Sequence, residues 1–176
     1  MITLNNGLWG ARVAEMGAEL KSLMDLASGQ EYIWNGDPAW WNGSAPVLFP
    51  VIGGLKAGEY SYEGKSYKLP SHGFARGSEF AVTRTGGDSA ELTLMSSPKT
   101  LAAYPFDFLL AVSLQLERAG IAVRYNVANT GSARMYFSIA RTLPSSCLLP
   151  AECWRTITCC SNGKRISSGG FSRTAW

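Results

Sequence analysis

Short segments of alternating apolar and polar residues, separated by compact turns, constrain this fold more than any other feature of the sequence. Residues 106–117 and 120–127 alternate over long runs with only a two-residue link between them. Residues 79–85 and 90–95 repeat the pattern around a turn that contains two glycines. A period of two is typical of a strand with one buried face, and links this short join antiparallel neighbours. We therefore predict an all-β chain folded as an antiparallel β-sandwich.

The length and composition of the chain fit a single globular domain. A chain of 176 residues can bury one substantial core, and its 46% hydrophobic residues, 19 glycines and 8 prolines indicate a turn-rich fold rather than disorder. The first residues lack the basic and apolar regions of a signal peptide, and no apolar run approaches the ~20 residues of a membrane helix. We expect a cytoplasmic protein without a membrane partner.

Basic charge and cysteine gather at the C-terminal end of the sequence. From residue 140 onward five basic residues face a single acidic one, and all four cysteines lie there as well. The pI near 8.7 therefore describes this end of the chain, and we expect no nucleic-acid partner. The cysteines lack the paired C-x2-C spacing of a zinc site, and the sequence contains no glycine-rich nucleotide-binding motif. We predict neither a bound metal nor a cofactor.

The best candidate for chemistry is the stretch of residues 69–80, which holds the only histidine of the chain, His72. Gly73, Phe74 and Arg76 follow it closely. A histidine titrates near neutrality and an arginine adds a permanent cation with a planar hydrogen-bonding fork, so the pair suits a polar or anionic ligand. A loop histidine that only hydrogen-bonds backbone is the competing interpretation, and the stretch alone leaves both open.

The residues before this stretch carry weaker signals. Trp34, Trp40 and Trp41 either line a sugar site, since aromatic faces pack against the C–H faces of pyranoses, or belong to the core. Glu15 and Glu19 are interpreted as solvated charges at strand edges.

An apolar run leads towards His72. Residues 45–52 carry two prolines, which places them at a sheet edge or in an irregular crossing. Gly53 and Gly54 follow, and they permit the backbone to pass close to a ligand. A compact hairpin over residues 59–69 then delivers the chain to the histidine.

Three blocks of this region carry a resemblance to a known family. They are residues 32–41, 45–56 and 67–76, with the sequences YIWNGDPAWW, APVLFPVIGGLK and YKLPSHGFAR. In this order and spacing they resemble the aldose 1-epimerase (galactose mutarotase-like) family, most closely its LacX-like branch, over roughly residues 1–139. The resemblance implies the galactose mutarotase-like supersandwich and an isomerase that interconverts the α and β anomers of a hexose or hexose phosphate.

The same resemblance implies roles for individual residues. His72 matches the family's sugar-binding histidine that supports ring opening, and it is the catalytic candidate. The implied substrate-binding residues are Arg76, Lys56, Phe74 and Trp34.

The chain departs from the family pattern in ways that bear on activity. Gly54 stands where the family usually has an arginine, which leaves Lys56 as the nearest cation. The family's general acid is a later histidine in a glycine-x-histidine-proline block, and its general base is a C-terminal glutamate. His72 is the only histidine here, and the chain ends before the region of that glutamate. We expect the chain as written to bind a sugar but to be inactive.

The strand pattern stops after Ile139, where the family continues into its histidine-proline block. Read one base out of phase, the codons of residues 140–145 can encode Ala-His-Pro-Ala-Phe. We therefore predict a one-base frameshift at about codon 140. Residues 1–139 are then the N-terminal part of a truncated mutarotase-like β-sandwich, and residues 140–176 an aberrant, disordered tail.

A divergent natural tail is the alternative for the second part, and a non-catalytic carbohydrate-binding β-sandwich module is the alternative for the function.

Overall fold

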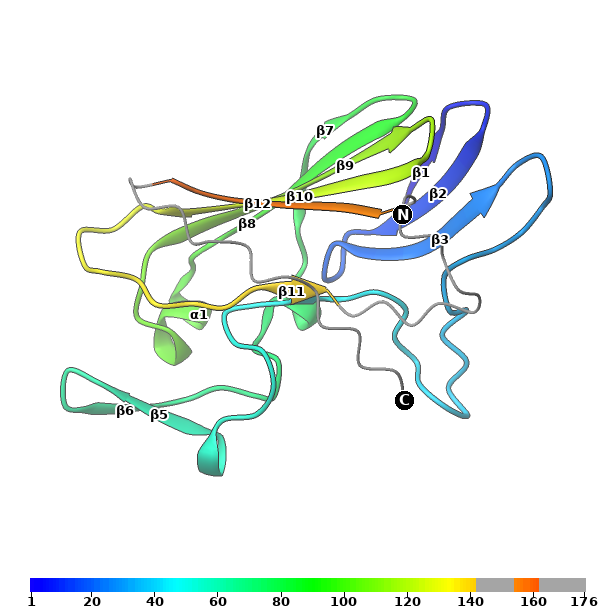
Figure 1. Cartoon of the computed structure of the whole chain (residues 1–176). Coiled ribbons are helices and arrows are strands. Elements are labelled where there is room, and N and C mark those ends of the chain that lie inside the picture. The colour runs from blue at the N-terminus through cyan, green and yellow to red at the C-terminus, as the bar shows by residue number, and fades with distance from the viewer. Residues whose placement is uncertain (142–153, 162–176) are drawn as a thin grey trace.

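The computed structural model of the chain describes residues 1–141 and 154–161, and strands dominate this part (Figure 1). Its one α-helix is α1 (Pro98–Ala103), six residues long. The named strands pair antiparallel in every case but one. The prediction of an all-β, largely antiparallel fold is confirmed. None of the helices in these residues has the length and apolar character needed to cross a membrane.

The larger sheet has the strand order β12-β10-β9-β8-β7. Its strands are β7 (Ala81–Thr85), β8 (Ser89–Met95), β9 (Phe108–Glu117), β10 (Gly120–Asn129) and β12 (Trp154–Ser161). β9 and β10 pair antiparallel over all ten residues, and β7 pairs antiparallel with β8. β12 is the exception, since it lies parallel to β10. Both hairpins predicted from the alternating pattern are therefore confirmed.

A three-stranded sheet supplies the other half of the core. It consists of β1 (Ile2–Asn5), β2 (Trp9–Ala14) and β3 (Glu19–Asp25) in that order. One hydrophobic cluster joins the two sheets, because the rows of side chains on their inner faces pack together. Its fully buried members include Leu4, Val13, Leu20, Leu92, Val112 and Phe108.

Two small two-stranded sheets lie beside this sandwich and position the loop of His72. β4 (Val47–Leu48) pairs with β11 (Ala140–Arg141), and β5 (Glu59–Tyr62) pairs with β6 (Lys65–Lys68). The chain segment of residues 45–52 contributes only the short β4 and contains the cis Phe49–Pro50 bond, as expected for an apolar run interrupted by prolines. The 3-10 turns η1 (Lys56–Gly58) and η2 (Ala75–Gly77) follow the glycine pair and the histidine respectively.

The last described residue before the gap, Arg141, is buried. Its Nε donates to the Tyr125 hydroxyl at 2.7 Å, and its terminal nitrogens donate to the carbonyls of Ala45 at 3.0 Å and Ala18 at 2.9 Å. The division at residue 139 and the disorder of residues 140–176 stay predictions, since residues 142–153 and 162–176 lie outside the described part. Within residues 140–176 the structure describes two strands, β11 and β12.

Candidate functional site

His72 is held by two hydrogen bonds to one residue, Gly53. The His72 N–H donates to the Gly53 carbonyl at 2.8 Å, and the Gly53 N–H donates to Nδ1 of the imidazole at 3.0 Å. Because Nδ1 accepts a hydrogen bond, the neutral ring carries its proton on Nε2. The backbone contact expected of a plain loop histidine is therefore present. It also fixes the tautomer, so that Nε2–H is the donor left for a ligand.

Gly73 seats this loop against the Phe49–Pro50 segment. Its φ is +71°, and a Cβ added to it would lie 2.2 Å from the Phe49 carbonyl oxygen. That same oxygen accepts the N–H groups of Phe74 and Ala75, both at 3.1 Å. Only glycine combines this backbone conformation with so close an approach.

Phe74 and Trp34, two of the implied substrate-binding residues, are half-buried. The half-buried Phe74 ring lies 6.1 Å from the Phe49 ring and 6.0 Å from the Phe108 ring, so it packs against the core. Trp34 is also half-buried, and its indole N–H donates to the Trp41 carbonyl at 2.9 Å. Only part of each ring is open to a ligand.

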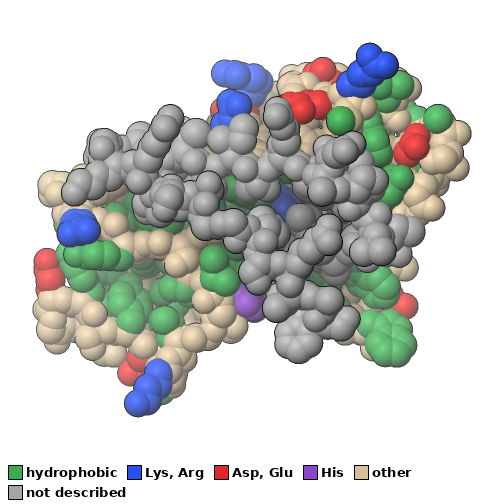
Figure 2. Space-filling view, viewed as in Figure 1, with side chains coloured by type: hydrophobic (Ala, Val, Ile, Leu, Met, Phe, Trp, Pro, Cys, Tyr) green, Lys and Arg blue, Asp and Glu red, His purple; other side chains and the backbone are tan. Residues whose placement is uncertain are grey.

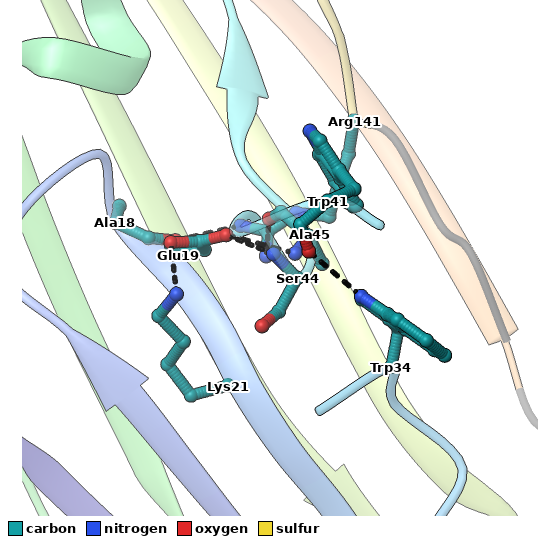
Figure 3. A network of polar contacts seen from close by, with 8 residues as sticks. All are labelled: Ala18, Glu19, Lys21, Trp34, Trp41, Ser44, Ala45 and Arg141. Atoms are coloured by element: carbon teal, nitrogen blue, oxygen red, sulfur yellow. Dashed lines mark hydrogen bonds and ion pairs between the residues drawn. The ribbon is translucent and has the colours of Figure 1, made fainter. Parts of the chain in front are cut away.

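The two predicted cations are exposed. Arg76 lies in η2, four residues after His72, and Lys56 lies in η1, three residues after Gly53. Within the described part of the chain neither of them forms an ion pair. The structure thus ties Phe74, Arg76 and Lys56 to the two segments that hold His72, whereas the Trp34 indole is hydrogen-bonded to the Trp41 carbonyl (Figure 3).

An aromatic cavity, which the sequence analysis missed, lies beside these segments. Its volume is about 550 Å³, within the range of small-molecule sites. Figure 2 shows the histidine on the same face as the hydrophobic side chains over the β5–β6 end of the molecule. The walls come from the β5 hairpin, from the Pro50 and Leu69 segments and from the chain before β11; the aromatic members are Tyr60, Tyr62, Tyr104, Phe106, Tyr136 and Phe137.

Two tyrosines of this cavity, Tyr60 and Tyr104, have hydrogen-bonded hydroxyl groups and raised pKa values. Tyr60 donates from its hydroxyl to the Ala103 carbonyl at 3.0 Å, and Tyr104 donates to the Tyr136 carbonyl at 2.8 Å. Burial raises the pKa of Tyr60 to about 12 and raises the pKa of Tyr104 as well. The cavity therefore offers aromatic faces without charge from these groups.

We expect Tyr60 to make the fold sensitive to alkali. Its pKa in the folded state is about 12, above the usual value of 10, so its share of stability is fully present below pH 10 and is lost as the pH rises to about 12. Urea unfolding midpoints measured from pH 9 to 12 should fall with pH, and Tyr60→Phe should flatten that fall. An unchanged pH slope in Tyr60→Phe would contradict this assignment, and Tyr32→Phe, whose ring lies against Trp9 rather than Tyr60, is the control.

The interpretation of Glu19 as a solvated charge is wrong. Its side chain is only 13% exposed. Oε1 accepts the backbone N–H groups of Ser44 and Ala45, and Oε2 pairs with Lys21 at 2.6 Å (Figure 3). The partners lie 25 and 26 residues away in sequence, so no local pattern indicates them. Glu15, by contrast, lies nearer the surface and pairs with the N-terminal ammonium group.

Comparison with known proteins defines the class to which this fold belongs. The structure superposes on that of a galactose mutarotase-like protein from Lactobacillus casei with a TM-score of 0.77 and 40% identity, over 79% of this chain and 47% of the other. It superposes equally well, with 33% identity, on a galactose mutarotase related enzyme from Lactobacillus acidophilus, over 78% of this chain and 46% of that one. The predicted galactose mutarotase-like β-sandwich is confirmed.

The sequence comparisons agree with the structural ones. The family model described as aldose 1-epimerase matches residues 1–141. Protein LacX of Lactococcus lactis is 30% identical over 133 residues, which cover 73% of this chain and 44% of LacX. The chain belongs to the aldose 1-epimerase family, in its LacX-like branch. It spans less than half the length of these relatives.

Proposed function

We propose that this chain derives from a cytoplasmic aldose 1-epimerase that interconverts the α and β anomers of a hexose or hexose phosphate, with His72 in direct contact with the sugar. The observation that carries the proposal is the pair of hydrogen bonds between His72 and Gly53, which leaves Nε2–H as a fixed donor. Membership of the aldose 1-epimerase family supports it.

The chemistry assigns a definite part to such a donor. Mutarotation passes through the open-chain aldehyde, so one group protonates the ring oxygen and another removes the proton of the anomeric hydroxyl. A positioned N–H stabilises the negative charge that develops on a sugar oxygen during these transfers. One imidazole does not supply both proton transfers at once, so a second acid or base is required.

The second acid or base is missing from this chain, and we attribute its absence to a shifted reading frame. We propose that the codons from about residue 140 are read one base out of phase, and that the correct phase encodes a histidine-proline block. The 176-residue chain then binds a hexose but does not accelerate mutarotation.

A non-catalytic sugar-binding module is the second candidate, and the aromatic cavity beside the His72 segments favours it. Polarimetry of freshly dissolved α-glucose and α-galactose distinguishes the two. Acceleration by the 176-residue chain supports the enzyme as it stands. Binding without acceleration supports either the module or the shifted frame, and correcting the frame separates those two.

Arg76 is the proposed contact for a phosphorylated sugar. Its exposed guanidinium lies four residues after His72 and forms no ion pair within the described residues. We expect Arg76→Ala to weaken binding of a hexose phosphate by about 1.5–3 kcal/mol, the cost of losing a charged hydrogen bond, with little effect on a neutral hexose. Calorimetric titration with glucose and glucose 6-phosphate measures both.

Lys99→Ala removes an exposed cation from α1 and serves as the control. Equal losses for Arg76→Ala and Lys99→Ala would show that only the overall charge matters. Equal losses of affinity for the neutral and the phosphorylated sugar would rule out Arg76 as a phosphate contact.

A further inference from the structure

The carboxylate of Glu19 acts as a latch on a distant backbone segment. Glu19 begins β3, and its Oε1 accepts the N–H groups of both Ser44 and Ala45, the latter at 3.1 Å. Figure 3 shows the carboxylate reaching across to this segment, with Lys21 on its other oxygen. Hydrogen bonds from backbone N–H groups to a carboxylate are charge-assisted and stronger than neutral ones.

The latched segment leads directly to the seat of His72. Every residue from 44 to 50 is buried, so this stretch has little freedom to shift independently of its neighbours. Its Phe49 carbonyl accepts the two N–H groups that follow Gly73, and Gly53 then makes both hydrogen bonds to His72. A displacement at Ala45 is therefore carried along eight residues of backbone to the imidazole.

The opposite side of the Ala45 peptide is also held. Its carbonyl accepts a hydrogen bond from Arg141 at 3.0 Å, while its N–H is held by Glu19. Arg141 falls where we propose that the frame changes, so its side chain depends on that frame. Glu19, which accepts the Ala45 N–H, is encoded before that point, so its side chain does not depend on the frame.

We propose that Glu19 is a positioning residue of the sugar site, which fixes the Ser44–Ala45 backbone and thereby the place and tautomer of His72. The proposal rests on the proposed role of His72 in sugar binding. Removing the carboxylate leaves two N–H groups of buried residues without their acceptor, and such groups draw the backbone towards another partner or towards water.

Three variants of the 176-residue chain separate the latch from the ion pair. Glu19→Leu removes the acceptor. Glu19→Gln keeps an oxygen that can accept both N–H groups but loses the charge that pairs with Lys21. Lys21→Ala removes the ion pair and leaves the latch intact.

The single histidine makes the measurement direct, because the imidazole 15N spectrum contains one ring only. In the unsubstituted chain we expect a non-protonated Nδ1 and a protonated Nε2. In Glu19→Leu we expect loss of this pattern and at least ~10-fold weaker binding of glucose, a factor that corresponds to about 1.4 kcal/mol. Glu19→Gln and Lys21→Ala should stay within about 3-fold of the parent affinity, less than about 0.7 kcal/mol.

The outcomes decide the proposal. An unchanged His72 spectrum and affinity in folded Glu19→Leu would overturn it, and so would losses in Lys21→Ala as large as those in Glu19→Leu. If Glu19→Leu does not fold, Glu19→Asp is measured instead. It keeps the charge but is one methylene too short to reach both N–H groups, so it should still disturb the His72 pattern, and an unchanged pattern would count against the latch.

The failure of sugar binding is distinguishable from failure of the latch. If the parent chain binds no glucose, the proposed function of this chain fails, while the His72 and Gly53 resonances of the variants still test the latch.

Discussion

Replacing Gly73 with alanine is expected to destabilise the fold by about 2–4 kcal/mol and to detach the His72 loop from its seat. A left-handed conformation costs a residue with a Cβ about 1–2 kcal/mol, and overpacking adds roughly 1–3 kcal/mol. Here φ is +71° and the new Cβ would lie 2.2 Å from the Phe49 carbonyl oxygen. The oxygen has no freedom to retreat, because it accepts the N–H groups of Phe74 and Ala75.

Thermal unfolding followed by circular dichroism measures this loss, which corresponds to a fall in Tm of roughly 5–15 °C for a chain of this size. Gly77→Ala is the matched control, since Gly77 lies in the same motif, has no positive φ and has open space where its Cβ would be. If the two variants unfold at the same temperature, the close approach of Gly73 to Phe49 is not what holds the loop.

The hairpins were predictable because their information is local. β7–β8, β9–β10 and β5–β6 alternate with a period of two and are joined by short turns, so neighbouring residues alone determine the pairing. The irregular course of residues 45–52 was equally evident from its two prolines. The galactose mutarotase-like fold followed from the three sequence blocks, and the structural comparison confirms it.

Features that depend on distant partners were not predictable. Glu19 looks like a surface charge in sequence, and only the folded chain brings it to the N–H groups of Ser44 and Ala45. The aromatic cavity combines side chains from four separate segments, residues 50–55, 60–69, 104–106 and 136–138. Helix α1 is short, and its signal is a capping box formed by Ser97 and Thr100, too local to stand out between two long strands.

The candidate site could be predicted from the sequence only in part. The family resemblance indicated His72, but the seat on Gly53 and the resulting tautomer come from the folded chain. The roles of His72, Arg76, Lys56, Phe74 and Trp34 in sugar binding stay predictions.

Inserting one base at about codon 140 is expected to produce a chain that accelerates mutarotation. We propose that the corrected frame encodes the histidine-proline block and the residues after it, and we expect these to provide the second proton-transfer group that His72 lacks. In that chain His72→Asn should lower the rate by roughly 10²-fold or more, the usual effect of removing a positioned group that transfers a proton or stabilises developing charge.

Ser71→Ala is the control for this substitution, because Ser71 is exposed and directly precedes His72. It should leave the rate within about 2-fold of the parent, well under the ~1.4 kcal/mol that corresponds to a factor of ten. A large loss in Ser71→Ala would mean that the loop tolerates no change and that the effect at His72 is not chemical.

The most direct test of the whole account is the anomer exchange rate of glucose and galactose at equilibrium, measured by NMR with the frame-corrected chain and its His72→Asn variant. The account predicts exchange well above the buffer rate for the corrected chain and a loss of about two orders of magnitude in the variant. An early stop codon in the corrected frame, or an active corrected chain whose exchange rate is unaffected by His72→Asn, would contradict it.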